Sequence, residues 1–154
     1  MQFGGHYLIA ARREDVWLAL NDTAVLKEAI PGCRRIEWVT PATLVAEIAV
    51  DFGVVKPVFT GDLELSDVVP AQSYTLSGGG RGGLLGLARA DARVTLADHD
   101  QGTELRFSAD GQASGRIMKL GHALVGNRAQ WVIDGFFERF AKAMGASWHT
   151  LEAD

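Results

Sequence analysis

The sequence predicts an α+β fold in which a curved antiparallel sheet of seven strands wraps around a long C-terminal helix. Three observations support this prediction. A strand-like segment at residues 2–10 is followed by two short helical segments, a period of two then runs from Cys33 to Asp110, and a helical period runs from about Arg116 to about Trp148. Parallel α/β folds are excluded because their helices alternate with their strands along the chain.

Apolar spacing and capping residues indicate the two short helices. Val16, Trp17 and Leu20 recur at helical spacing in the first. Asn21-Asp22 is a good N-cap for the second helix, and Pro31-Gly32 stops it. Two short helices are therefore expected between the first strand and the remaining six.

The six middle strands alternate apolar and polar residues, and turn residues separate them. In residues 43–51, Leu44 and Ala46 share one face while Glu47 points to the other. This pattern is typical of an antiparallel sheet with one face in the core and one in solvent. The other residues that this alternation places inward are Ile48, Val50, Phe59, Leu63, Leu65, Tyr74, Leu76, Leu105, Phe107 and Ala109.

The predicted last helix carries two apolar stripes that a straight helix cannot bury on one sheet face. Gly121, Gly126 and Gly135 each lower helix propensity by about 1 kcal/mol relative to alanine, and we expect a kink near Gly126. Arg128 is the one charge between Leu124 and Trp131, and either reaches to the surface or binds an anionic or carbonyl group. The stripes are Ile117, Leu120, Leu124 and Trp131, and then Ile133, Phe136, Phe137, Phe140 and Met144.

The element order β-α-α-β6-α is that of the helix-grip fold of the START-like (SRPBCC) superfamily. A chain of 154 residues, of which 47% are hydrophobic and 22% charged, can bury a core of its own. We therefore expect one START-like ligand-binding domain over residues 1–154.

Small inward residues predict an apolar pocket between the sheet and the last helix. Ala88, Ala90 and Ala92 face inward on one strand, opposite a helix that contains glycines. The alternative is that the alanines let the helix approach closely, and that the inward aromatics are ordinary core residues. The candidate ligand-binding residues are Trp17, Phe52, Phe59, Tyr74, Leu76, Ala90, Phe107, Leu120, Leu124 and Trp131.

Several chemistries are excluded by the composition and the motifs. The formal charge is −4 and the basic residues are scattered among acids, which excludes nucleic acid as a partner. The single cysteine, Cys33, forms no intrachain disulfide, and no histidine pattern indicates a metal site. We find no nucleophile elbow or triad, so no catalytic residue, metal or cofactor is predicted.

The stretch Gly78 to Gly86 does not match a phosphate-binding loop, because it lacks the Gly-Lys-Ser/Thr ending and precedes a strand. We expect it to form a wide hairpin that serves either as a mobile lid or as a passive turn. The N-terminus lacks the features of a signal peptide, and no apolar run approaches the roughly 20 residues that span a bilayer. A cytoplasmic location is therefore expected.

Several segments of the sequence resemble the CoxG family of carbon monoxide dehydrogenase subunits. The combination of a Trp-x-x-Leu-x-Asp motif at Trp17 with an Ile-Pro-Gly-Cys turn is its most specific part. The segments that carry the resemblance are Met1-Gln2-Phe3-Gly4-Gly5, Val16-Trp17-Leu18-Ala19-Leu20-Asn21-Asp22, Ile30-Pro31-Gly32-Cys33, Phe59-Thr60-Gly61, Ser114-Gly115-Arg116-Ile117, Leu120-Gly121 and Phe136-Phe137.

The resemblance implies a non-enzymatic protein that binds a hydrophobic ligand such as a quinone or a lipid. It implies a role in the assembly, membrane recruitment or electron coupling of a molybdenum-containing carbon monoxide dehydrogenase or a related hydroxylase, with peripheral contact at the inner face of the membrane. Two alternatives remain open. One is an enzyme of the polyketide cyclase or dehydratase type, for which Tyr74 is the one inward acid/base candidate, and the other is a ligand-free interaction protein.

Overall fold

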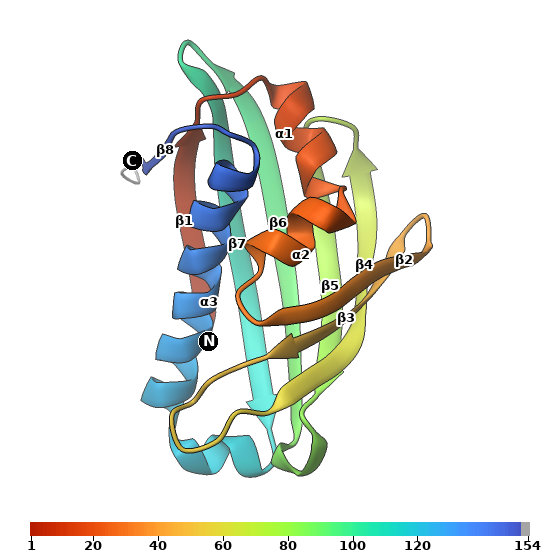
Figure 1. Cartoon of the computed structure of the whole chain (residues 1–154), viewed down its shortest axis with the longest axis vertical. Coiled ribbons are helices and arrows are strands. Elements are labelled where there is room, and N and C mark those ends of the chain that lie inside the picture. Colours follow the sequence, from red (N-terminus) through yellow and green to blue (C-terminus); the bar gives the residue numbers. More distant parts are fainter. Residues whose placement is uncertain (152–154) are drawn as a thin grey trace.

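The strands pair antiparallel into one sheet that curves around the last helix, in the order β2-β3-β4-β5-β6-β7-β1-β8 (Figure 1). The computed structural model describes residues 1–151, so the last three residues of the predicted domain lie outside the described part. The α+β class and the helix-grip arrangement are confirmed. The elements are β1 (Gln2–Ile9), α1 (Arg13–Leu20), α2 (Thr23–Ala29), β2 (Cys33–Thr40), β3 (Thr43–Ala49), β4 (Val58–Val69), β5 (Ser73–Arg81), η1 (Gly83–Leu85), β6 (Leu87–His99), β7 (Gly102–Ser114), η2 (Arg116–Leu120), α3 (His122–Ala143) and β8 (Trp148–Thr150).

The C-terminal part differs from its prediction at both ends of the helix. Gly121 adopts φ 93° and ψ 145°, a conformation that glycine reaches without strain, so the break separates the 3₁₀ helix η2 from α3 at this residue and not near Gly126. The helix ends at Ala143, and Trp148 lies in the short strand β8, which pairs with β1. Within residues 1–151 the sheet therefore has eight strands, whereas the alternation predicts seven.

The stretch Gly78 to Gly86, predicted as one wide hairpin, consists of a strand segment followed by a short connection. Gly78, Gly79 and Gly80 are part of β5, where Gly78 pairs with Ala90 and Gly80 pairs with Ala88 of β6. The connection between β5 and β6 is confined to residues 82–86 and contains η1. The first half of the predicted hairpin is therefore sheet.

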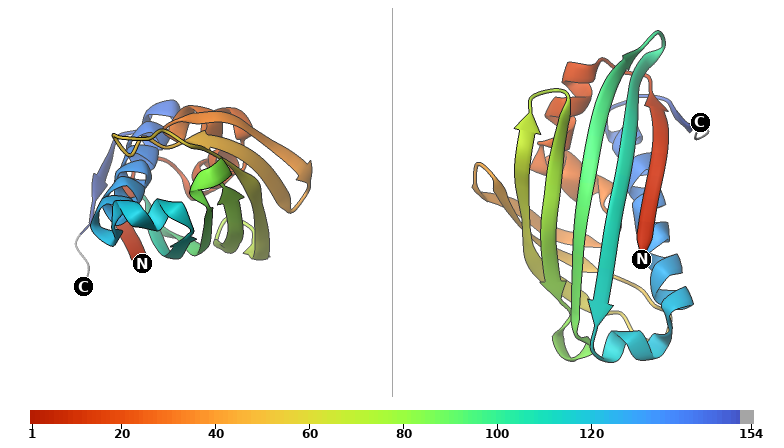
Figure 2. Two further views of the ribbon diagram at one scale, coloured as in Figure 1. Left: turned by 90° about the horizontal axis from the view of Figure 1, so that it is seen from below. Right: turned by 180° about the vertical axis from the view of Figure 1, so that it is seen from behind.

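The concave face of the sheet holds three apolar clusters, and α1, α2 and α3 all lie on this side (Figure 2). The first cluster joins the C-terminal half of α3 and α1 to β1, β5, β6 and β7, and the Phe140 side chain is fully buried there. The second packs α2 on β2 and β3 through Leu26, Ile36 and Leu44. The third closes the opposite end of the sheet with Phe52, Ile117 and Val125. Asp22 caps α2 as predicted, accepting a hydrogen bond from the Ala24 amide at 2.9 Å.

An aromatic stack fixes α3 against the first strand. The rings of Tyr7 and Phe137 lie 4.3 Å apart and nearly parallel, and Phe107 meets Phe137 edge-on at 5.7 Å. The Tyr7 ring lies over Gly5, two residues earlier on the same face, where an added Cβ atom would overlap the ring. Gly5 is therefore required for this close approach.

Replacing Gly5 with alanine is expected to lower the free energy of unfolding by about 1–3 kcal/mol, because the new Cβ atom displaces the buried Tyr7 ring from its stack on Phe137. Equilibrium urea unfolding measures this loss. Gly4→Ala is the matched control: a Cβ atom there lies on the opposite face of β1 and has only the Phe107 carbonyl oxygen nearby, at 3.3 Å. Equal losses in the two variants would show that the Tyr7 stack does not require the glycine.

Candidate functional site

The middle of the concave face is covered by glycine and alanine. Strand pairing places Gly78 of β5, Ala90 of β6 and Gly111 of β7 side by side in one row. Residues two apart in a strand share a face, and Val94 and Leu96 of β6 are core residues, so this row faces the same side as the core. The next row toward the end of the sheet consists of Ala46, Gly61, Gly80, Ala88 and Ala113.

The face of α3 that joins the first and third clusters is also small in the middle. Val125, Ala129, Ile133 and Phe137 are spaced four apart and therefore follow one face of α3. Val125 belongs to the third cluster, whereas Ile133 and Phe137 pack in or against the first. Ala129 lies between the two clusters on this face of the helix. On the sheet, the side chains of Leu63 and Phe3 border the row of small residues, Leu63 beside Gly78 and the Phe3 ring beside Gly111.

The side chains in this middle region remain accessible although they point toward the covered face. Ala90 is exposed, and Ala109 and Gly111 are half-buried, whereas Ala92, two residues further along β6, is buried. Neither Ala90 nor Ala109 packs in any of the three clusters. We call this accessible apolar region around Gly78, Ala90, Ala109 and Gly111 the open floor.

Most of the predicted ligand-binding residues surround the open floor from its two ends. On the side of the first cluster, Tyr74 is a buried member, and Trp17, Leu76 and Phe107 pack against it. On the side of the third cluster, Phe52 is a buried member, and Phe59 and Leu120 pack against it. Ala90 lies between the two groups. Leu124 is half-buried on the first turn of α3.

Trp131 is not brought together with the other predicted residues. Its side chain is 55% exposed, and it lines a separate groove of about 160 Å³ between α3 and the end of β3. Arg128 is half-buried in the same groove. The groove is lined by Pro31, Gly32, Ala49, Val50, Asp51, Arg128, Trp131, Val132 and Arg139.

The glycines of the floor and Ala129 were not among the site residues that the sequence predicted. The signal was present on β5, because Gly78 and Gly80 continue the period of two that begins with Tyr74 and Leu76. A run of glycines indicates a turn more strongly than a strand, so the sequence alone does not predict strand at these positions. Ala129 carries no distinguishing pattern in the sequence.

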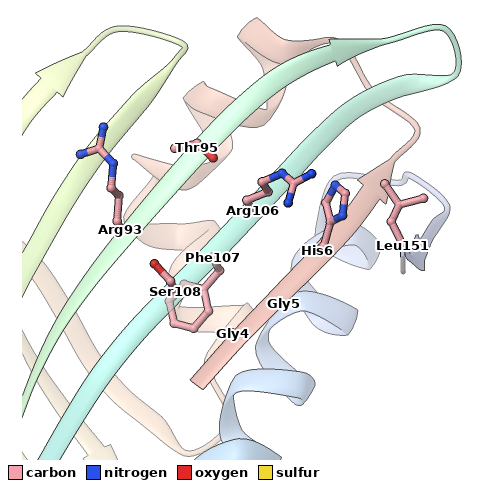
Figure 3. Close-up of a pocket in the computed structure, with 9 residues that line it drawn as sticks. All are labelled: Gly4, Gly5, His6, Arg93, Thr95, Arg106, Phe107, Ser108 and Leu151. Carbon is pink, nitrogen blue, oxygen red and sulfur yellow. The ribbon is translucent and has the colours of Figure 1, made fainter. Parts of the chain in front are cut away.

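A second groove, of about 580 Å³, lies on the outer face of the sheet (Figure 3). Its walls include His6, Arg93 and Arg106, which alternate along their strands with core residues that point the other way. The His6 Nε2 atom lies 3.5 Å from an Oε atom of Glu104. The sheet separates this groove from the open floor, so the two are independent surfaces.

Burial makes the candidate acid/base groups poor proton donors and acceptors at neutral pH. Desolvation raises the pKa of Tyr74 to about 12, and it also raises the pKa of the Cys33 thiol.

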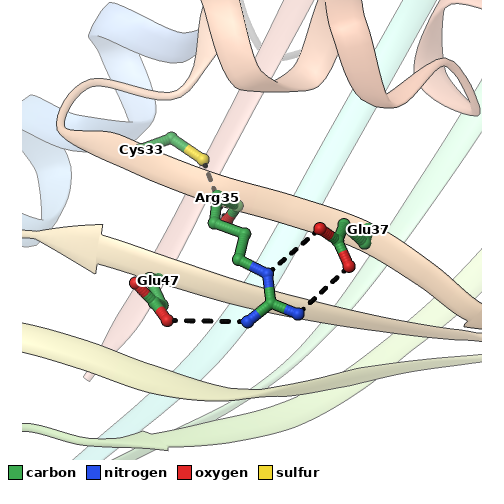
Figure 4. A network of polar contacts seen from close by, with 4 residues as sticks. All are labelled: Cys33, Arg35, Glu37 and Glu47. Atoms are coloured by element: carbon green, nitrogen blue, oxygen red, sulfur yellow. Dashed lines mark hydrogen bonds and ion pairs between the residues drawn. The ribbon is translucent and has the colours of Figure 1, made fainter.

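The Cys33 thiol lies beside an exposed ion-pair network, in which Arg35 binds both carboxylate oxygens of Glu37 at 3.1 Å and approaches Glu47 at 3.7 Å (Figure 4). These hydrogen bonds hold the pKa of Glu37 below its usual value. Neither Tyr74 nor Cys33 is matched to proton transfer near pH 7.

Two further features of residues 1–151 bear on function. No group of three or more His, Cys, Asp or Glu side chains in this part of the chain could hold a metal ion. No helix in the same part is both long and apolar enough to cross a bilayer.

Solved structures share this architecture. A conserved protein from Geobacillus kaustophilus superimposes with a TM-score of 0.84 at 24% identity, covering 97% of this chain and 99% of that one. The protein CV1439 from Chromobacterium violaceum superimposes with a TM-score of 0.73 at 15% identity, covering 93% of this chain and 96% of that one. The ZhuI aromatase/cyclase from Streptomyces sp. R1128 superimposes with a TM-score of 0.71 at 13% identity, covering 94% of this chain and 93% of that one. Among curated proteins, none is a significant match.

The fold and the open floor define a helix-grip protein of the START-like kind, in which a curved sheet and a terminal helix enclose apolar surface. The sequence profile of the CoxG family of carbon monoxide dehydrogenase subunits matches residues 5–145. The chain belongs to this family.

Alkaline pH is expected to destabilise the protein through its buried tyrosines. A tyrosine with a folded-state pKa of about 12 and an unfolded value of 10.0 contributes stability that is complete below pH 10 and is lost as the pH rises toward about 12. Between pH 8 and pH 11 the Tyr74→Phe variant should lose about 1 kcal/mol less than the parent protein in urea unfolding. The pKa of Tyr7 is also raised, so tyrosinate absorbance near pH 10 in the folded protein would contradict this account.

Proposed function

We propose that this protein binds a hydrophobic molecule, a quinone or a lipid, on the open floor beneath α3, and that it does so without catalysing a reaction. The observation that carries the proposal is the accessibility of Ala90, Ala109 and Gly111, which face the covered side of the sheet between two packed clusters. Apolar surface in such a position gains free energy by burying an apolar ligand, about 0.8 kcal/mol for each CH₂ group removed from water.

The shape of the region suits a flat or extended ligand. The glycine and alanine positions form a shallow apolar surface, which the side chains of Leu63 and Phe3 border together with the rings of Phe107 and Phe59. Rings of this kind make dispersion contacts along a quinone or an isoprenoid chain. We extend the proposal to the remaining predicted residues Trp17, Phe52, Tyr74, Leu76, Leu120 and Leu124, which border the region or lie on the helix above it.

The groove beside α3 is a suitable place for a polar head group. Arg128 and Arg139 line it together with Trp131, and neither arginine forms an ion pair within residues 1–151. A guanidinium group binds carboxylate, phosphate or carbonyl oxygens through several N–H donors. Trp131 thus belongs to the proposal as a contact of the head group and not of the apolar tail.

The family gives the proposal its biological setting. Its description names a subunit of carbon monoxide dehydrogenase, so we propose that the partner is an enzyme of that molybdenum-containing type, or a related hydroxylase. In this setting residues 1–154 act as one domain in the cytoplasm, with peripheral contact at the inner face of the membrane, and serve assembly, recruitment or electron coupling.

An enzyme of the cyclase type is the second candidate, because an aromatase/cyclase has the same fold. A cyclase requires a polar acid/base group in contact with its substrate. The inward candidate, Tyr74, has a pKa of about 12 and is almost fully buried in the first cluster, which does not favour this role. Turnover of a polyketide-like substrate that is lost in Tyr74→Phe would support the enzyme instead.

Filling the floor tests the binding proposal. Ala90→Phe is expected to weaken the uptake of decylubiquinone and of oleic acid by about tenfold or more, because the new ring occupies the space that the ligand would fill. Native mass spectrometry and quenching of tryptophan fluorescence measure the uptake. Ala97→Phe, at an exposed position on the outer face of the same strand, is the matched control and should bind as the parent protein does.

Two results would oppose the proposal. If Ala90→Phe binds both probes as tightly as Ala97→Phe, the floor is not the binding surface. If the parent protein binds neither probe and carries no extractable quinone or lipid when purified from its own host, the ligand-free interaction protein is favoured.

A further inference from the structure

Three loops meet at the end of the sheet that lies away from α1. They are residues 50–57, between β3 and β4, residues 82–86, between β5 and β6, and residues 116–121, which contain η2. Phe52, Leu85 and Ile117, one from each segment, pack in or against the third cluster, so the loops share one small core. Figures 1 and 2 show these segments together at one extremity of the molecule, which we call the loop end.

The loop end carries two aliphatic side chains that are mostly exposed to solvent. Leu84 is 86% exposed and Val54 is 80% exposed. Their neighbours Leu85 and Val55 pack against the third cluster, so each loop turns one apolar side chain inward and holds the preceding one in solvent. A single exposed leucine is ordinary, but two at the tips of loops with a common core form an apolar feature.

Basic residues surround these two side chains. Arg81, Arg116 and Lys119 are exposed and take part in no ion pair within residues 1–151. Lys56 lies 3.9 Å from Asp51, the one carboxylate that the three loops contain. The whole chain has a formal charge of −4, so the loop end is a basic pole on an acidic protein.

We infer that the loop end docks on an anionic lipid bilayer. Leu84 and Val54 enter the boundary between head groups and acyl chains, while Arg81, Arg116 and Lys119 lie at the level of the lipid phosphates. Basic residues near an anionic membrane surface are attracted to the lipid phosphates, and inserted aliphatic side chains add their transfer free energy. Shallow apolar insertion with a basic surround is the pattern of peripheral membrane proteins.

The inference deepens the proposed function and rests on it only for its biological purpose. A protein that carries a quinone or lipid has to meet the membrane in which such molecules dissolve. The docking residues are different from those of the open floor, because Leu84 and Val54 point away from the cluster that bounds it. Docking and ligand uptake can therefore be measured and abolished separately.

Co-sedimentation of the full chain with lipid vesicles tests the inference. Binding is expected to vesicles of phosphatidylcholine that contain phosphatidylglycerol as roughly one lipid in three, and to weaken by about tenfold or more on pure phosphatidylcholine. The double variant Val54→Asp, Leu84→Asp should lose about tenfold or more in affinity for the anionic vesicles, because both insertions are removed. Both positions are so exposed that the melting temperature should not change.

Matched controls come from the opposite end of the molecule. Leu18 on α1 is 67% exposed, and Leu18→Asp should leave vesicle binding unchanged. Arg116→Gln with Lys119→Gln should reduce the preference for anionic vesicles, whereas Arg12→Gln, beside α1, should not. The inference is overturned if anionic vesicles are not bound, or if Leu18→Asp weakens binding as much as the loop-end variant. Binding of the partner enzyme through the loop end without any vesicle binding would also overturn it.

Ligand uptake in the same variants keeps the two proposals apart. The Val54→Asp, Leu84→Asp protein should take up decylubiquinone from solution as the parent does, while Ala90→Phe should still bind anionic vesicles. Loss of vesicle binding in Ala90→Phe alone would assign membrane contact to the floor and reject the loop end.

Discussion

The interior of this protein depends on how α3 is held against the sheet. At its C-terminal half, the stack of Phe137 on Tyr7 and the buried ring of Phe140 set the distance between the helix and the strands. At its N-terminal end, Val125 packs with Phe52 and Ile117. Between these two ends the same face of α3 carries the small side chain of Ala129, and the sheet carries Gly78 and Ala90 in its middle. The open floor is a direct result of this geometry, since packing to normal density would need large side chains at these positions.

The same constraint explains why the interior is suited to binding and poorly suited to proton-transfer chemistry. The groups that border the floor are aliphatic and aromatic, and the one titratable side chain among the predicted contacts, Tyr74, is shifted by burial to a pKa of about 12. The polar side chains of the sheet point the other way, as in the outer groove with His6, Arg93 and Arg106. Strand alternation thus assigns the apolar and polar functions of the sheet to opposite faces.

The ends of the sheet are specialised as well. The end near α1 is closed by the first cluster, whereas the loop end has a small core and turns aliphatic and basic side chains outward. The third cluster has a double role in this arrangement, because it bounds the open floor and also holds the three loops that carry Leu84 and Val54. The open floor and the loop end therefore border the same cluster but use different residues.

The sequence by itself determined the class of fold, the order of the elements and the inward faces of the strands, because hydrophobic period and capping are local properties. The cap at Asp22 and the inward positions of Ala90 and Phe107 follow from them. The tertiary structure decided the strand partners, the position of the helix break and the orientation of α3. Gly78 to Gly80 belong to β5 because they pair with β6, where Ala88 and Ala90 lie opposite Gly80 and Gly78. The helical segment breaks at Gly121, before the predicted position at Gly126, because of the backbone conformation there. Trp148 is a strand residue because it pairs with β1. The separation of Trp131 from the floor likewise depends on which face of α3 meets the sheet. Strand partners and helix orientation are set by contacts between residues far apart in the sequence, so the hydrophobic period along the chain does not predict them.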